Sequence, residues 1–211
     1  MPLGAGCPRC ASPVSQDGDT WRCTDHGPIA PLWRPATADY GSFADQLTRS
    51  RAIPTLMPWP LPPGWSVTDF GVVAAPGEDA RAGFVTCSGA SDLDGVVELT
   101  VVTEEPRVGL GARCAGVRHT DPGAEIGEGP PLAKVRIDGH PISLWPVLTS
   151  DADVAFDRSV FAGEALGRWL WLVLRPASAA LLLNDELVLM DVADLGPELM
   201  ELPFGGSPPG W

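Results

Sequence analysis

Three cysteines and one histidine near the N-terminus have the spacing of a metal site. Two residues separate Cys7 from Cys10 and Cys23 from His26, and twelve residues lie between the two pairs. Each pair can bind one ion from a tight turn, and a hairpin in the intervening residues would bring the pairs together. Three thiolates and one imidazole complete the tetrahedral shell of Zn²⁺ and leave no position for water or substrate. The spacing therefore predicts a structural Zn²⁺ ion in a zinc ribbon spanning residues 1–35.

The same residues allow a second interpretation, a redox-active pair at Cys7 and Cys10. A thioredoxin-type C-x-x-C motif follows a strand and opens a helix, but only six residues precede Cys7. A segment of about 35 residues also buries too little apolar surface to fold alone, whereas Zn²⁺ can contribute on the order of 10 kcal/mol of apparent binding free energy. Without the ion, the ribbon is expected to unfold.

A second group of candidate functional residues lies in a stretch rich in Gly, Pro and charge, residues 104–130, which is predicted to be a long irregular loop. In its sequence GLGARCAG, Cys114 stands where a dinucleotide-binding motif needs its third glycine, so a tight loop is favoured over a phosphate cradle. Arg113, Cys114 and Arg118 are the candidate contacts for a small ligand, and an anion would suit the two arginines. The simpler alternatives are ion pairs with nearby acids and a buried, unreactive cysteine.

Catalytic interpretations of this stretch also have simpler competitors. Cys114 could act as a nucleophile with His119 or His140 as its base, but an isolated cysteine beside strands is more often a small buried hydrophobic residue. Glu104 and Glu105 would point to opposite faces of a strand, so they are expected to be solvated charges and not an acid–base pair. The chain contains no G-x-S-x-G or G-x-x-x-x-G-K-[ST] motif.

The amino-acid composition indicates which classes of partner the chain can bind and in which cellular compartment it is expected. The chain has 27 Asp and Glu residues against 14 Lys and Arg residues, a formal charge of −13, which gives no general attraction to phosphate backbones or anionic lipid. Nucleic-acid binding and membrane insertion are therefore disfavoured, and the longest apolar segment, residues 169–183, is too short to span a bilayer. An odd number of cysteines and an N-terminus without the features of a secretory signal predict a cytoplasmic protein.

The elements that would position these residues are mostly strands. A short helix is expected over residues 39–51 with a capping box at Ser42, and the connector PTLMPWPLPPGW that follows excludes helix and central strand. Three strands are predicted from WSVTDFGVVAA, GFVTCSG and VVELTVV, a hairpin from KVRI and PISLW around Asp138-Gly139, and three more strands from GRWLWLVL, AALLL and ELVLMDV. ADLGPELMEL is expected to form a short final helix.

This pattern predicts an α+β chain in which the zinc ribbon precedes a mostly antiparallel β-sheet domain with one or two short helices. In a strand, Trp169 and Trp171 would share one face and the leucines beside them the other, so both faces need cover. The Pro-rich connector laid across this strand would supply cover, and a partner-binding or self-associating surface is the alternative. The expected divisions are a ribbon at 1–35, a short helix and connector at 36–64, an α+β domain at 65–205 and a flexible tail at 206–211.

The finger CPRC…CTDHG, the connector MPWPLPPGW and the strings GLGARCAG, VFAGEALGRWLWLVLRP and DELVLMDV together resemble an uncharacterised actinobacterial domain-of-unknown-function family. The resemblance covers nearly the whole chain. It implies a shared N-terminal zinc finger and a shared MPWPLPPGW connector, and it carries no known activity, substrate or partner.

These observations favour a non-enzymatic interaction or regulatory protein that holds structural Zn²⁺ and binds a protein partner or a second copy of itself. The alternative is a small-molecule enzyme or ligand sensor that uses the loop at 104–130. Nucleic-acid binding through the ribbon alone is the weakest hypothesis. Three thiolates and one dication add a formal −1 to a segment whose other charges cancel.

Overall fold

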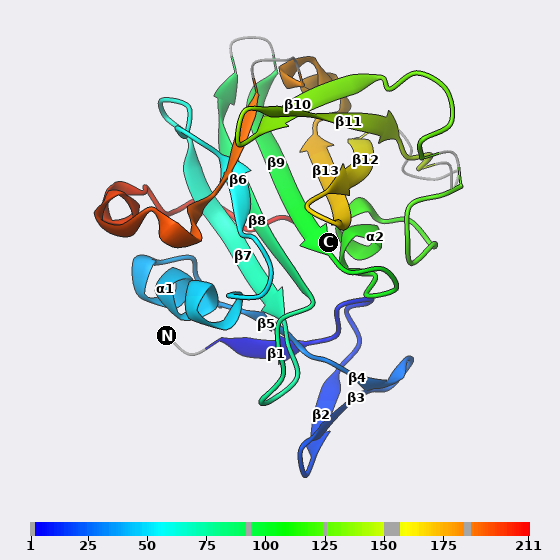
Figure 1. Ribbon diagram of the computed structural model, residues 1–211. Coiled ribbons are helices and arrows are strands. Elements are labelled where there is room, and N and C mark those ends of the chain that lie inside the picture. Colours follow the sequence, from blue (N-terminus) through cyan, green and yellow to red (C-terminus); the bar gives the residue numbers. More distant parts are fainter. Residues whose placement is uncertain (1–2, 92–93, 125, 150–156, 184–186) are drawn as a thin grey trace.

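Strands dominate the structure (Figure 1). The computed structural model describes residues 3–91, 94–124, 126–149, 157–183 and 187–211. Within these residues, eleven strands form one sheet in which all neighbours pair antiparallel except β10 and β14, which run parallel. The α+β class and the mostly antiparallel sheet predicted from the sequence are confirmed. In spatial order the strands are β1 (Gly4–Gly6), β5 (Leu32–Arg34), β7 (Ser66–Val73), β8 (Ala82–Ser91), β9 (Gly95–Glu104), β13 (Arg168–Arg175), β12 (Ser159–Ala165), β11 (His140–Pro146), β10 (Ala133–Ile137), β14 (Val188–Asp191) and β6 (Leu56–Pro58).

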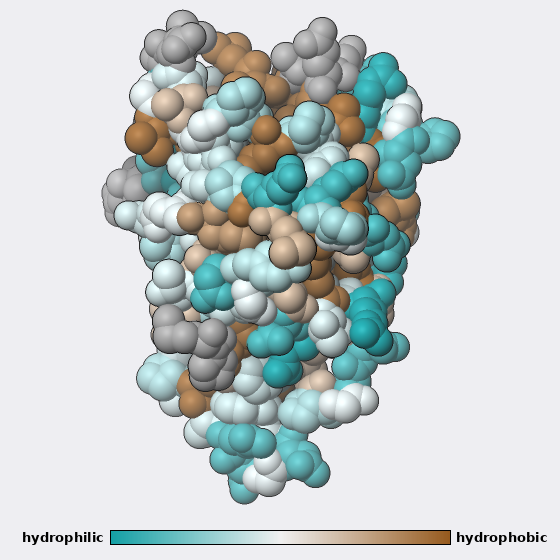
Figure 2. Space-filling model, turned by 90° about the vertical axis from the view of Figure 1, so that its left-hand side faces the viewer, coloured by the Kyte–Doolittle hydropathy of each residue, from teal (hydrophilic) through white to brown (hydrophobic). Residues whose placement is uncertain are grey.

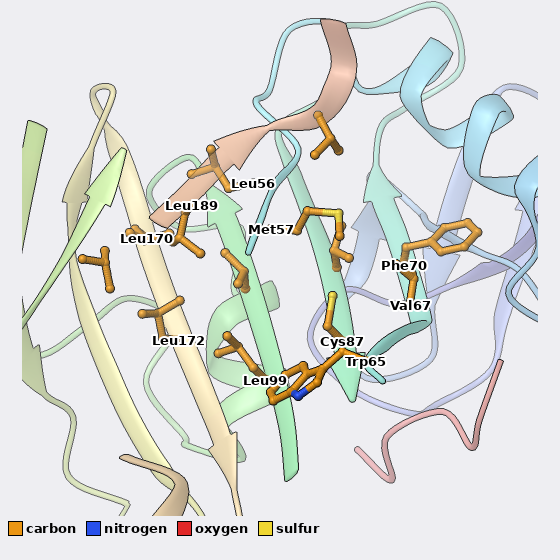
Figure 3. Close-up of a cluster of buried hydrophobic side chains, with 14 of the residues drawn as sticks. Leu56, Met57, Trp65, Val67, Phe70, Cys87, Leu99, Leu170, Leu172 and Leu189 are labelled. Atoms are coloured by element: carbon orange, nitrogen blue, oxygen red, sulfur yellow. The ribbon is translucent and has the colours of Figure 1, made fainter. Parts of the chain in front are cut away.

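The sheet curls so that its last strand packs over its middle. Strand β6 contacts β8 and β9, and Figure 1 shows it in front of them. Leu56 and Met57 of β6 are buried in the same cluster as Leu99 and Leu172, as Figure 3 shows. The Pro-rich connector thus contains a short edge strand, a position that tolerates Pro58 because no ladder N–H is needed there.

The helix predicted from the chain after the ribbon is confirmed as α1 (Tyr40–Arg49), with a different N-cap. The Asp39 side chain accepts a hydrogen bond from the Ser42 backbone N–H at 2.8 Å, so Asp39 and not Ser42 caps the helix. Phe43 packs edge-on against Phe70 of β7, with ring centroids 4.9 Å apart, which fixes α1 on the sheet. In the described part of the chain, no helix combines the length and the apolar character needed to cross a bilayer.

The strand predicted from AALLL is wrong, because these residues lie in the 3-10 helix η1 (Ala177–Leu182). Ala179 is fully buried, whereas Leu181 is 75% exposed. A short apolar run does not distinguish a strand from a helix, and here Ser159 of β12 also holds the start of η1 by donating to the Ala177 carbonyl at 2.8 Å.

The final helix predicted from ADLGPELMEL is broken into two 3-10 helices, η2 (Val192–Asp194) and η3 (Gly196–Glu201). Gly196 has a φ of +60°, which no regular right-handed helix contains, and Pro197 follows it without a backbone N–H to donate. The strand before them, predicted from ELVLMDV, forms as β14, while Glu186 lies outside the described residues.

The hairpin predicted at Asp138-Gly139 is confirmed. Ile137 of β10 pairs with His140 of β11, and both turn residues have positive φ, +50° and +79°. A second turn of this kind, Leu166-Gly167, joins β12 to β13 with φ of +54° and +72°. Strand β12 was not predicted, because a leucine at positive φ is not a recognisable turn signal.

Both faces of β13 are covered, as its sequence requires. Trp171 packs in the cluster that contains the residues of helix α2 (Leu110–Ala115), whereas Leu170 and Leu172 pack in the cluster that contains β6 and β14. A Cβ at Gly111 of α2 would overlap the Trp171 ring, so glycine allows this close approach. The connector covers the leucine face with β6, and helix α2 covers the tryptophan face.

Candidate metal centre

A small three-stranded sheet positions the predicted metal ligands. Its antiparallel strands β2 (Val14–Asp17), β3 (Thr20–Cys23) and β4 (Gly27–Ile29) project from the lower end of the molecule in Figure 1. Cys23 is the last residue of β3 and His26 directly precedes β4, while Cys7 and Cys10 follow β1. The residues between the two pairs form the hairpin that the spacing required.

Four of the six distances between the ligand atoms match those that a tetrahedral ion requires. His26 Nδ1 lies 3.6 Å from Cys7 Sγ, 3.4 Å from Cys10 Sγ and 3.6 Å from Cys23 Sγ. The Sγ atoms of Cys10 and Cys23 are 3.5 Å apart, and all four atoms lie within 4.8 Å of one another. A Zn²⁺ ion with bonds of about 2.0–2.3 Å would separate its ligand atoms by about 3.3–3.8 Å, because a tetrahedron's edge is about 1.6 times its centre-to-corner distance. The cluster could therefore bind a metal ion without a further donor.

Neighbouring polar groups tune the ligand thiols. Burial raises the pKa of the Cys7 thiol to about 11, although the Arg9 backbone N–H donates to its Sγ at 3.4 Å and acts in the opposite direction. Burial also acts to raise the pKa of Cys10, but hydrogen bonds from the Ser12 side chain and backbone outweigh it and lower that pKa to about 6. The opposite directions of the two shifts mean that Cys10 gives up its proton to an ion more readily than Cys7 does.

The cluster is only partly open to solvent. Cys7 and Cys23 are 1% and 3% exposed, Cys10 is half-buried and His26 is exposed. Four protein side chains fill a tetrahedral shell, so an ion bound here would have no open corner for a substrate. A closed site of this kind stabilises a fold and does not bind a substrate.

Reciprocal hydrogen bonds join the metal centre to the sheet domain near α2. Arg9, between the first two cysteines, donates from Nε to the Val108 carbonyl at 3.0 Å and from Nη2 to the Arg107 carbonyl at 2.7 Å. Arg113 of α2 donates in return to the carbonyl of Cys7. These bonds add to the attachment of the ribbon at its two ends, where β1 pairs with β5 and β5 pairs with β7 in the large sheet.

Glu104 fixes the start of α2 from the end of β9. Its fully buried carboxylate accepts hydrogen bonds from the backbone N–H groups of Leu110 at 2.8 Å and Gly111 at 3.2 Å. Burial raises its pKa to about 7 against the lowering effect of these two bonds. The expectation of a solvated charge at Glu104 is wrong, because the helix presents unsatisfied N–H groups to this carboxylate. Nothing in the sequence distinguishes Glu104 from Glu105, so this residue could not be found from the pattern alone.

The stretch 104–130 is not irregular throughout, since GLGARCAG forms helix α2 with its flanking glycines. Its three candidate ligand contacts do not converge. Arg113 donates to the ribbon, and Cys114 is fully buried, which raises its pKa far above the usual range. Arg118 is exposed and lines a cleft of about 600 Å³ with His119 and Asp121.

The guanidinium of Arg113 also lies against the last residue of the sequence. Its Cζ is 4.9 Å from the centroid of the Trp211 ring, and Arg34 Cζ is 4.5 Å from the same ring. Trp211 packs edge-on against Phe84, with centroids 5.0 Å apart. The end of the segment expected to be a flexible tail thus has defined packing partners.

Comparison with known protein families gives one match over nearly the full length. A model described as "Family of unknown function (DUF6758)" matches residues 1–210, which include the metal ligands, the connector and the sheet domain. Comparisons with the curated proteins and with the solved structures gave no match. The chain therefore belongs to the DUF6758 family of unknown function.

Proposed function

We propose that this chain is a non-enzymatic, zinc-binding protein of the cytoplasm that acts in protein interaction or regulation. The observation that supports this best is the metal centre, in which three thiols and one imidazole lie within 4.8 Å of one another. A thiolate-rich set of four favours Zn²⁺ over hard cations and fills its tetrahedral shell. The ion would then hold the ribbon in shape and take no part in a reaction.

The remaining thiols support a non-catalytic role. Cys87 and Cys114 are both fully buried, and burial raises the pKa of each thiol. A buried, protonated thiol is neither a nucleophile nor a redox sensor.

Metal analysis and cobalt substitution test the structural assignment of the ion. We expect one equivalent of zinc per chain, lost in Cys23→Ser and retained in Cys87→Ala, which removes a thiol from the sheet domain. With Co²⁺ in place of zinc, the absorption bands of tetrahedral thiolate coordination should stay unchanged in millimolar azide. Bands that shift with azide would reveal an open position and overturn the assignment.

The interaction role is tested by sedimentation of the purified protein and by affinity purification of the tagged chain from its native cell. We expect a homo-oligomer or a stoichiometric protein partner. A strictly monomeric protein with no partner enriched over a tag-only control would contradict the role.

A ligand sensor is the second candidate, and the cleft of about 600 Å³ beside Arg118 favours it. The arginine and the histidine that line it suit an anionic ligand, although Asp121 lines the same cleft with the opposite charge. Inorganic phosphate and succinate should then raise the thermal midpoint of the protein, and Arg118→Ala should abolish the increase. An unchanged midpoint with both anions would remove this candidate.

A further inference from the structure

An open groove of about 580 Å³ lies between the Pro-rich connector and the end of the last 3-10 helix. The connector wall carries two tryptophans and two prolines, and the opposite wall carries two glutamates and a proline. These wall residues are Trp59, Pro60, Pro62, Trp65, Glu198, Glu201 and Pro203. The Pro-rich connector, which has no part in the metal centre, therefore forms one side of a surface groove.

The walls of this groove are held by the core. Trp65 is only 8% exposed, its ring lies beside Leu99 in Figure 3, and a Cβ at Gly89 of β8 would overlap that ring. The Trp65 backbone N–H donates to the Pro62 carbonyl at 3.0 Å. On the other wall, the Val67 N–H donates to the Pro203 carbonyl at 2.9 Å. A groove built this way is pre-organised, so a ligand would lose little free energy in shaping it.

The charge of the groove has a single sign. Glu198 and Glu201 are both exposed, and three residues make one turn of a 3-10 helix, so their side chains lie on the same side of η3. They are the charged residues that line the groove. Within the described part of the chain, neither carboxylate has an ion-pair partner, and no guanidinium stacks on Trp59 or Trp65.

A second aromatic hollow, of about 470 Å³, provides a contrast. It contains Trp21 and Trp33 with Glu78 and Asp79 nearby, but there Arg49 of the same chain already lies over the Trp33 ring, 5.1 Å from its centroid. The chain thus fills one aromatic and acidic site with its own cation. The groove beside η3 has the same ingredients without the cation.

We propose that this groove binds an extended, proline-containing basic segment of a protein partner. Indole rings attract Arg and Lys side chains, carboxylates complement their charge, and grooves lined by aromatic residues accept polyproline II segments. The net charge of −13 attracts a basic protein and repels nucleic acid and anionic membranes. The proposal rests on the interaction function proposed above and names its partner class.

Fluorescence anisotropy with a defined peptide tests the proposal on the full-length, zinc-loaded protein. The probe is a fluorescein-labelled peptide with two copies of Arg-Pro-Leu-Pro, and the same peptide with Glu in place of Arg is its control. We expect Glu198→Gln/Glu201→Gln to weaken binding about tenfold, because the peptide's arginines lose two carboxylate partners. The matched variant Glu78→Gln/Asp79→Asn removes the same charge from the second hollow and should change affinity less than twofold. Absence of binding, equal binding of both peptides, or equal weakening by both variants would overturn the proposal.

The indole N–H resonances locate the bound peptide. Those of Trp59 and Trp65 should shift during titration, while those of Trp21 and Trp33 stay in place, with Trp59→Phe providing an assignment. If a second copy of the chain occupies the groove instead, sedimentation would show a dimer that dissociates in the Glu198→Gln/Glu201→Gln variant, and the basic-peptide assignment would be wrong. The two proposals can fail separately. If the cobalt spectrum is insensitive to azide but no peptide binds, only the proposed role of the groove is wrong. If the peptide binds but the cobalt spectrum shifts with azide, only the structural role of the ion is wrong.

Discussion

The ribbon and the sheet domain reach their folded states by different means. Between residues 9 and 29 only Cys23 is buried, and the lowest part of the molecule in Figure 2, where the ribbon lies, is mostly hydrophilic. The sheet domain instead buries hydrophobic clusters on both faces of its central strands. With the proposed ion in place, folding of the ribbon would depend on metal binding, whereas folding of the sheet domain depends on removal of apolar surface from water.

Loss of the metal should separate the two regions most clearly. In Cys23→Ser, or after chelation, the ribbon loses on the order of 10 kcal/mol of apparent binding free energy. Amide exchange should then become fast in β2, β3 and β4 while β13 stays protected. The exposed Ser15→Ala substitution in the same ribbon should leave zinc and protection unchanged. If the ribbon amides stay protected from exchange without metal, the ribbon does not depend on the ion for its fold.

A cavity in the sheet domain should destabilise that domain and leave the metal centre intact, the opposite of metal removal. Leu172 of β13 is fully buried in the cluster that contains β6 and β14, so Leu172→Ala should lower the free energy of unfolding of the domain by about 2–5 kcal/mol. Urea denaturation measures this loss, and the zinc content should not change. Val96→Ala, at a side chain 74% exposed, should cost less than about 0.5 kcal/mol. If zinc affinity falls together with stability in Leu172→Ala, the two regions form one cooperative unit.

The two regions should also respond oppositely to pH. The ribbon should lose its proposed ion as pH falls, because protons compete for the thiolates. Glu104 acts in reverse, since its pKa is raised from an ordinary 4.5 to about 7 in the folded protein. Its favourable contribution to the free energy of unfolding is complete below about pH 4.5. This contribution is lost as pH rises to about 7, a change on the order of 3 kcal/mol.

The Glu104→Gln variant isolates this contribution. Asp69 and Glu98 also have raised pKa values, because both are buried, so the wild-type curve contains more than one titration. Unfolding free energies of wild type and variant, measured between pH 5 and 8, should therefore be compared as slopes. Parallel curves would mean that Glu104 titrates normally and that burial does not control it.

Features set by local spacing were predictable from the sequence, and features set by tertiary packing were not. The metal ligands, the Asp138-Gly139 hairpin and the opposite faces of Trp171 and Leu172 follow from periods and spacings of a few residues. The buried role of Glu104 and the turn at Leu166-Gly167 depend on contacts between distant segments. Their residue types carry no local signal of those contacts.

The Pro-rich connector illustrates the same division within one segment. Its prolines correctly exclude helix, and they also favour an extended path. Whether that path stays solvated or pairs as an edge strand is decided by β14, which lies more than a hundred residues later in the chain and pairs Leu189 with Pro58. The groove beside Trp59 exists because η3 follows β14 and brings its two glutamates to the connector.

The smallest expected effect concerns the contact that joins the two regions. Arg113→Ala removes both the hydrogen bond to the Cys7 carbonyl and the contact with the Trp211 ring, and should weaken docking of the ribbon by about 1–2 kcal/mol. Zinc should stay bound, because no ligand atom is altered, while amide exchange and proteolysis become faster at residues 107–110. The exposed Arg22→Ala substitution removes a guanidinium from the ribbon away from this contact and serves as its control.

Because Arg9 still donates to Val108 and Arg107 in both variants, the ribbon should loosen in Arg113→Ala without detaching. Complete loss of protection there, or loss of zinc, would mean that the junction and not the ion holds the ribbon together.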